Sequence, residues 1–189
     1  MKGVPIVAIG FSAGGLNPLK DFFDSTLHDK VSYVILQHLP LEYKSRLKDI
    51  LKRHSKLQII EVEEGMAVDP NKVYVLPRKQ FMVIKEGVFQ LIERDKGVFP
   101  NRAVDIFMES LAGLGNCMAV ILSGSGDDGT KGISSIKKGG GIVIAQTPDS
   151  CEHSSMPENA IKSGNVDHVM LPSEMPGIIQ QYVKQAGRE

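Results

Sequence analysis

The sequence has little of what marks several large protein classes. Its 189 residues include two cysteines, Cys117 in an apolar run and Cys151 in a polar segment. Two cysteines cannot build a disulfide framework and their spacing is not that of a zinc site, so the default is a reducing, cytoplasmic compartment. The longest apolar runs fall far short of the roughly 20 residues of a membrane span, and no basic region leads into a cleavable signal. We therefore expect a cytoplasmic protein without direct membrane insertion.

An excess of charge of either sign is also missing. Lys and Arg together number 22, and Asp and Glu together number 22. A balanced chain has no net field that would attract nucleic acid or an anionic membrane, so neither is expected as a partner. There is no internal repeat and no low-complexity linker, and the length suits one folding unit. We expect a single domain over residues 1–189, for which the sequence indicates no oligomeric state.

Apolar runs alternate with amphipathic segments along most of the chain. Buried strands are predicted at residues 6–9, 31–37, 117–122, 142–146 and 166–171. Apolar residues at helical spacing predict helices at residues 16–23, 43–53, 104–114, around 133–136, from 156 onward and at 178–185. Strands that alternate with helices are typical of parallel sheets. The sequence therefore predicts an α/β fold with a doubly wound, mostly parallel sheet and helices on both faces.

The pattern changes between residues 58 and 92. Short alternating pieces at 59–62, 73–76, 81–84 and 88–92 are separated by turn residues. Such pieces are typical of short strands, some of them in hairpins. We expect them to form a short antiparallel hairpin region at one edge of the sheet.

A glycine-rich turn, GFSAGG, follows the first predicted strand at residues 10–15. A strand, then Gly-x-Ser-x-Gly, then a helix lifts one serine hydroxyl above the carboxyl edge of a sheet and leaves room for a substrate. Ser12 is therefore a candidate nucleophile. A glycine-rich turn at this place also occurs for close packing alone.

Three polar groups directly follow long apolar strands: Ser12, His38 and the pair Asp127 and Asp128. Because the carboxyl ends of parallel strands meet at one edge, the fold brings these groups together. A serine needs a base to take its proton, histidine titrates near neutral pH, and a carboxylate orients the imidazole. The sequence therefore predicts a nucleophilic triad. The order Ser, His, Asp and the serine's place after the first strand exclude the α/β-hydrolase fold.

An oxyanion that forms at such a site needs backbone donors. The amides of Ala13 and Gly14, at the start of the first helix, could supply one donor. The glycine-rich segment that contains Ser125 and Gly126 could supply another.

Each of these groups also has a plainer interpretation. His38 could be a structural histidine at a strand end, and the acidic pair could form an ordinary turn and helix cap. The oxygen-ligand spacing of a calcium loop is absent, so no metal is expected. The glycines fit neither Gly-x-Gly-x-x-Gly nor a phosphate loop. Nucleotide binding is therefore the weaker alternative, and no cofactor is expected.

Three motifs in this order, GFSAGG at residues 10–15, QHLP at 37–40 and GSGDDG at 124–129, resemble those of a known family. They are similar to the catalytic domain of the CheB-type chemotaxis protein-glutamate methylesterases. Val-Asp at residues 104–105 and Met-Pro at 156–157 look like further family landmarks, so the resemblance covers nearly the whole chain.

The resemblance implies a hydrolase that cleaves glutamate γ-methyl esters on the cytoplasmic helical bundle of chemoreceptors, often with deamidation of glutamines there. The partner it implies is the methylated cytoplasmic domain of a chemoreceptor. It also implies that Ser12 is the nucleophile, His38 the base and Asp128 the orienting carboxylate, with Asp127 at a variable position.

The sequence departs from the family pattern at two points. Ser125 stands where the family usually carries methionine, beside the expected oxyanion hole, although a backbone amide remains available there. Family enzymes usually have an N-terminal phosphorylatable receiver domain, whereas this chain begins almost at its first strand. It is either a piece of a longer protein or acts without that switch. The alternative to an enzyme is a receptor-binding module of the same fold with weak chemistry.

Overall fold

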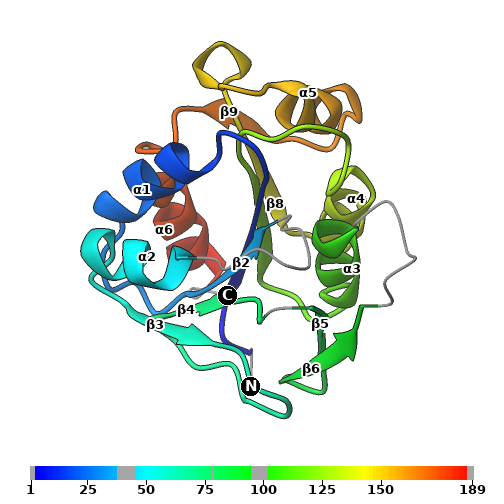
Figure 1. The fold of residues 1–189 in the computed structure, drawn as a ribbon. Coiled ribbons are helices and arrows are strands. Elements are labelled where there is room, and N and C mark those ends of the chain that lie inside the picture. Colours follow the sequence, from blue (N-terminus) through cyan, green and yellow to red (C-terminus); the bar gives the residue numbers. More distant parts are fainter. Residues whose placement is uncertain (1–2, 38–45, 78, 95–101, 187–189) are drawn as a thin grey trace.

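A computed structural model describes residues 3–37, 46–77, 79–94 and 102–186 of the chain (Figure 1). Its main element is a sheet of parallel strands, which are β1 (Ile6–Phe11), β2 (Ser32–Gln37), β3 (Gln58–Glu61), β4 (Lys72–Val75), β7 (Cys117–Ile121), β8 (Ile142–Gln146) and β9 (His168–Met170). Their order across the sheet is β3-β4-β2-β1-β7-β8-β9, and every neighbouring pair is parallel. The predicted α/β fold with a mostly parallel sheet is confirmed.

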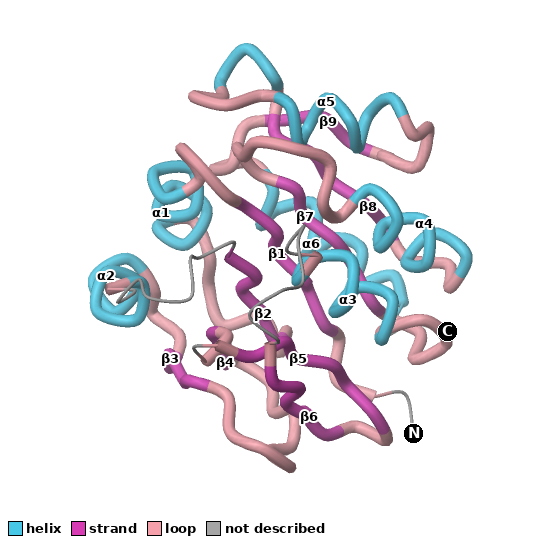
Figure 2. Tube along the Cα trace, turned by 45° about the vertical axis from the view of Figure 1, so that its right-hand side comes forward, coloured by secondary structure: helices cyan, strands magenta, loops and turns pink. Residues whose placement is uncertain are grey.

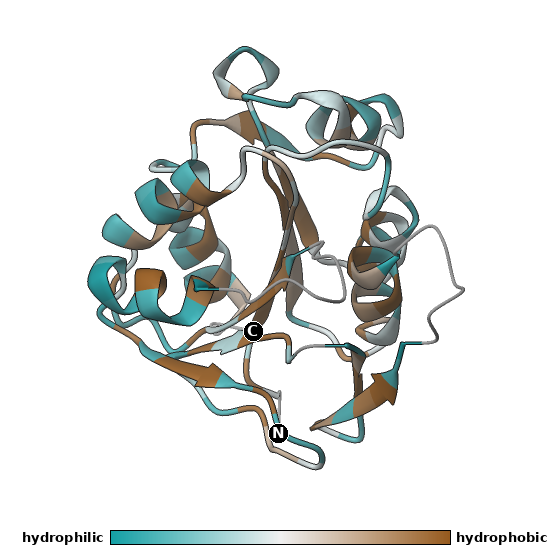
Figure 3. Cartoon of the chain, viewed as in Figure 1, coloured by the Kyte–Doolittle hydropathy of each residue, from teal (hydrophilic) through white to brown (hydrophobic). Residues whose placement is uncertain are grey.

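Helices cover both faces of this sheet (Figures 1 and 2). One face carries α1 (Leu16–Asp24), α2 (Leu47–His54) and α6 (Met175–Ala186), and the other carries α3 (Ala103–Ser110), α4 (Thr130–Lys138) and α5 (Ser155–Lys162), which follows the short 3₁₀ helix η1 (Pro148–Ser150). Apolar side chains form a separate core on each face. In Figure 3 the strands are mostly hydrophobic, while hydrophilic residues cover much of the helices. Burial of these two apolar layers is the main force that holds the helices to the sheet.

The hairpin region differs in part from the prediction. Strands β5 (Gln80–Lys85) and β6 (Val88–Glu93) are antiparallel and form a two-stranded sheet of their own. The two preceding strands, β3 and β4, instead pair in parallel and extend the main sheet. In β4, Val73 and Tyr74 are fully buried, as expected for a strand that is covered on both faces. The tilted ring pair of Tyr74 and Phe89, with centroids 4.7 Å apart, fixes the hairpin against the sheet.

The chain order places a topological switch point between β1 and β7. From β1 the chain builds the β2 side of the sheet first, and only after the hairpin and α3 does it return to form β7 on the other side of β1. Ligands of open α/β sheets bind at the carboxyl ends of the strands where the order reverses. The loops that follow β1 and β7 are therefore the expected location of a site. None of the helices within the described ranges is long and apolar enough to cross a membrane.

Candidate active site

The loops after β1 and β7 are joined directly at the carboxyl edge of the sheet. The amide of Ser12 donates a hydrogen bond to the carbonyl oxygen of Ser123 (3.1 Å), and the amide of Leu122 donates to the carbonyl oxygen of Gly10 (2.9 Å). Ser12 itself is half-buried, so its side chain is partly accessible to solvent. The turn that carries the candidate nucleophile is thus held against the glycine-rich loop at the switch point.

The turn that contains Ser12 requires glycine at position 14. Gly14 has φ +71°, and a methyl group there would lie 2.6 Å from Glu152 Cβ and 2.9 Å from Ser123 Oγ. Any other residue would therefore be strained and would collide with the loop that follows β8. The turn closes with a hydrogen bond from the Gly15 amide to the carbonyl oxygen of Ser12 (3.1 Å), and α1 begins at the next residue. The positive end of the α1 dipole consequently lies beside Ser12.

The structure gives the two acids after β7 different environments. The carboxylate of Asp128 is 4% exposed and accepts hydrogen bonds from the amides of Val104 (3.0 Å) and Asp105 (2.9 Å). Asp127 is exposed and its carboxylate pairs with the guanidinium of Arg102 (2.9 Å). Of the acidic pair, Asp128 therefore caps a helix, as the plainer interpretation expects. The helix that it caps is α3, however, and not α4, which follows Asp128 in the chain. A buried carboxylate held by two amides has a fixed position, whereas Asp127 is at the surface.

His38, the predicted base, lies outside the described residues. The neighbouring Gln37 ends β2 and is paired with Phe11, the residue before Ser12. The assignment of Ser12, His38 and Asp128 as a triad stays a prediction.

The loop amides named for the oxyanion differ in their hydrogen bonding. The amide of Gly124 donates to the carbonyl oxygen of His153 (2.9 Å), and the amide of Gly126 donates to Ser155 Oγ (3.1 Å). Among the described residues, no hydrogen bond engages the amide of Ser125, and the same holds for Ala13 and Gly14. Of the three amides of Gly124, Ser125 and Gly126, that of Ser125 is therefore the one that the described residues leave for a ligand.

A buried serine that sequence reasoning missed connects three loops. The hydroxyl of Ser123 lies 3.0 Å from the carbonyl oxygen of Ala13 and 3.1 Å from that of His153, and it accepts a hydrogen bond from the His153 amide (3.0 Å). The amide of Ser123 donates to Gln146 Oε1 (2.9 Å). The loops after β1, β7 and β8 are thereby fixed to one another. No local pattern singles out Ser123, because all of its partners except the Gln146 side chain are backbone groups far away in sequence.

Glu152 and His153 form a second group that the sequence analysis left without a role. Glu152 Oε1 lies 3.7 Å from His153 Nε2, and both side chains are exposed to solvent. Glu152 also packs against Gly14 in the turn that follows Ser12. This loop therefore forms one wall of the site and carries an acid and an imidazole that both face solvent.

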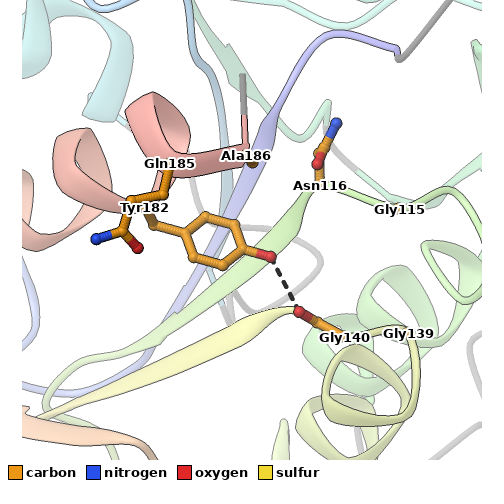
Figure 4. Close-up of a pocket in the computed structure, with 7 residues that line it drawn as sticks. All are labelled: Gly115, Asn116, Gly139, Gly140, Tyr182, Gln185 and Ala186. Carbon is orange, nitrogen blue, oxygen red and sulfur yellow. Dashed lines mark hydrogen bonds between the residues drawn. The ribbon is translucent and has the colours of Figure 1, made fainter. Parts of the chain in front are cut away.

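The described residues contain no group of three or more His, Cys, Asp or Glu side chains suited to a metal ion. A cavity of about 400 Å³ exists elsewhere, between the glycine loops before β7 and β8 and the end of α6 (Figure 4). Tyr182 lines it and donates a hydrogen bond to the carbonyl oxygen of Gly140 (2.9 Å). These loops precede their strands, so the cavity lies at the amino edge of the sheet, opposite the loops around Ser12.

Comparison with known proteins gives a consistent result over almost the whole chain. A family model described as CheB methylesterase matches residues 7–179. The protein-glutamate methylesterase/protein-glutamine glutaminase 2 of Dechloromonas aromatica (strain RCB) is 31% identical over 185 residues, which cover 95% of this chain and 52% of that protein. The protein of the same name from Shewanella oneidensis (strain MR-1) is 32% identical, with 97% of this chain and 54% of that protein covered. The chain spans about half the length of the curated relatives it matches.

A solved structure has the same fold. The crystal structure of the Thermotoga maritima CheB methylesterase catalytic domain matches with a TM-score of 0.86 and 31% identity. The match covers 95% of this chain and 99% of that one, so the similarity extends over the full architecture and not only the central strands.

Proposed function

Because this chain belongs to the CheB methylesterase family, we propose that it is a serine hydrolase that cleaves the γ-methyl esters of glutamate residues. The proposed substrate is the methylated cytoplasmic helical bundle of a chemoreceptor, which would place the protein in the cytoplasm. The relatives' names also include a protein-glutamine glutaminase, so the proposal extends to deamidation of glutamines at the same site.

In the first half of the proposed reaction, Ser12 Oγ attacks the ester carbonyl while His38 takes the hydroxyl proton. The tetrahedral intermediate collapses, the bond to the methoxy oxygen breaks, and His38 gives its proton to the departing methanol. The glutamyl group is then esterified to Ser12. A glutamine substrate would follow the same course with ammonia as the leaving group.

In the second half, water attacks the ester on Ser12 while His38 again takes a proton. The second tetrahedral intermediate releases Ser12 Oγ, which recovers its proton from His38, and the product is a glutamate carboxylate. The amides of Ala13, Gly14 and Ser125 are the donors that we assign to the oxyanion in both halves. Since the Ser125 amide would be the donor, the replacement of the family's methionine by serine does not remove it.

Asp128 would orient His38 and stabilise the imidazolium that forms in each half-reaction. Burial of its carboxylate and its two backbone hydrogen bonds support this role, because a carboxylate with a fixed position costs little reorganisation during the reaction. Asp127, which is exposed and paired with Arg102, is not assigned to the reaction.

The observation that carries the proposal is the position of Ser12: half-buried, on a turn that needs glycine at position 14, and hydrogen-bonded through its amide to the β7 loop at the switch point. The experiment that tests it is methanol release from a methylated receptor fragment. The alternative, a receptor-binding module with weak chemistry, is separated by measuring binding to the same fragment. Binding without methanol release would support that alternative and contradict the enzyme.

A further inference from the structure

Two buried acids cap each other's helices on the α3–α4 side of the site. Asp128, just before α4, accepts hydrogen bonds from the amides of Val104 and Asp105 in the first turn of α3. Asp105 in turn accepts hydrogen bonds through Oδ1 from the amides of Gly129 (2.9 Å), Lys131 (3.0 Å) and Gly132 (2.8 Å) at the start of α4. Each acid therefore satisfies amides that the other helix leaves unpaired.

These reciprocal hydrogen bonds take the place of capping by the N-cap residues of α3 and α4. The N-cap residues of α3 and α4, Arg102 and Gly129, make no capping hydrogen bond with a side chain. Gly129 has φ +97°, and a methyl group there would lie 3.0 Å from Val104 Cγ1. The two helix starts thus approach closely enough for each carboxylate to reach across. The segment that carries Asp128 is tied to α3 at both its side chain and its following backbone.

The same arrangement brings two carboxylates together away from solvent. Asp105 and Asp128 are each 4% exposed. Burial raises the pKa of the Asp105 carboxyl above its ordinary value and the charge of Asp128 raises it further, against the lowering effect of the Gly132 amide. On the solvent side, Arg102 Nη1 lies 3.5 Å from Asp105 Oδ2 and also pairs with Asp127. Lys131 of α4 contacts Asp105 through its backbone amide.

We propose that Asp105 is a positioning residue for Asp128. Asp105 fixes the backbone that follows Asp128 and adds a second negative charge beside the Asp128 carboxylate. This inference rests on the proposed function, since it assigns to Asp128 the orientation of His38. Two consequences can be separated. Loss of the three amide contacts should displace Asp128, and loss of the charge alone should make the imidazolium of His38 less favourable.

Two variants test these consequences separately. Asp105→Ala removes both the acceptor and the charge, whereas Asp105→Asn keeps an oxygen that can accept from the three amides. We expect kcat for methanol release to fall by about 10- to 100-fold in Asp105→Ala, with little change in KM, because small displacements of catalytic groups have effects of this size. Asp105→Asn should recover most of that loss. Its acid limb of kcat/KM should shift to lower pH, because removal of a nearby negative charge lowers the pKa of the base.

Asp167→Ala is the matched structural control. Asp167, like Asp105, accepts a hydrogen bond from a backbone amide far away in sequence, here that of Val143 in β8 (2.8 Å), and it pairs with Lys137, but it lies at the amino edge of the sheet. It should lower thermal stability without a change in kcat or in the pH profile. If Asp105→Ala, at temperatures where it is fully folded, behaved like this control, the positioning role would be wrong.

Labelling of Ser12 by a fluorophosphonate probe, which reacts with an activated serine without needing the natural substrate, provides a second readout. We expect the labelling rate of Asp105→Ala to fall in parallel with kcat. If the wild type is labelled but releases no methanol, the proposed substrate is wrong. In that case the inference is still tested by the labelling rates, and equal rates for the wild type and Asp105→Ala would overturn it. Absence of both labelling and methanol release in the wild type would overturn the proposed function together with the inference.

Discussion

The backbone amide of Ser12 donates a hydrogen bond to the carbonyl oxygen of Ser123 (3.1 Å), and the Ser123 hydroxyl lies 3.0 Å from the carbonyl oxygen of Ala13. One buried serine after β7 thus holds the turn of the candidate nucleophile through both its backbone carbonyl and its hydroxyl. The orientation of Ser12 consequently depends on a residue that itself need not touch a substrate.

Ser123→Ala should lower both stability and activity. The variant leaves the His153 amide and two carbonyl oxygens without the hydroxyl, and an unsatisfied buried group costs about 1–3 kcal/mol. Urea denaturation measures the first effect and kcat for methanol release the second. Ser32→Ala is the control, since Ser32 is also buried but bonds the carbonyl oxygen of Asp69, away from the site. A Ser123→Ala variant with wild-type kcat would show that this serine does not orient Ser12.

Ser125 should act through its backbone and not through its side chain. Ser125→Ala and Ser125→Met retain the amide, so their kcat for methanol release should stay near that of the wild type. Ser125→Pro removes the amide and should reduce kcat by about 10²- to 10³-fold, as expected for loss of one oxyanion donor. Thermal denaturation establishes that each variant is folded. Equal activity of the alanine and proline variants would exclude this amide as a donor.

Substitution of His38 and of His153 tests which histidine is the general base. His38→Gln should reduce kcat by several orders of magnitude, because the members of a triad act as a unit. His153→Gln should have a small effect, although its imidazole lies in the wall of the site beside Glu152. Methanol release measures both. The opposite pattern would assign the base to His153 and would require a different triad.

The hydrolysis should not depend on a thiol. Burial raises the pKa of both cysteines, Cys117 and Cys151, to about 11, and the charge of Glu158 contributes to the rise at Cys151. A raised thiol pKa means that the thiolate is a minor species below that value, about one part in a thousand at pH 8. Iodoacetamide at pH 8 should therefore label both cysteines slowly and leave methanol release intact. Rapid labelling of Cys151 with parallel loss of activity would point to a cysteine nucleophile.

The sequence is sufficient to predict the central part of the fold. The continuous apolar runs that became β1, β2, β7 and β8 are long enough to be recognised as parallel strands, and turn signals mark their ends. The same runs place Ser12 and Asp128 after β1 and β7 at one edge. Pairing of the short strands is harder to predict: β3 and β4 have four residues each, and alternation over so short a stretch does not show whether a strand joins its neighbour in parallel.

The contacts that support the site are not visible in the sequence, because they join residues far apart in the chain. In the sequence, Asp105 stands out only as part of a motif, whereas its partners are amides more than twenty residues away. Ser123 likewise bonds backbone groups of two other loops. A local sequence pattern identifies residue types that can take part in catalysis. The hydrogen bonds that hold those residues in place are made with backbone groups, which are the same in every sequence and therefore give no signal.

The most direct test of the account is methanol release from a methylated chemoreceptor cytoplasmic fragment by the wild type and by Ser12→Ala. The removed hydroxyl is the proposed nucleophile, so kcat should fall by several orders of magnitude while the variant keeps the thermal stability of the wild type and still binds the fragment. Wild-type turnover by Ser12→Ala would contradict the assignment of Ser12 as the nucleophile and, with it, the proposed reaction.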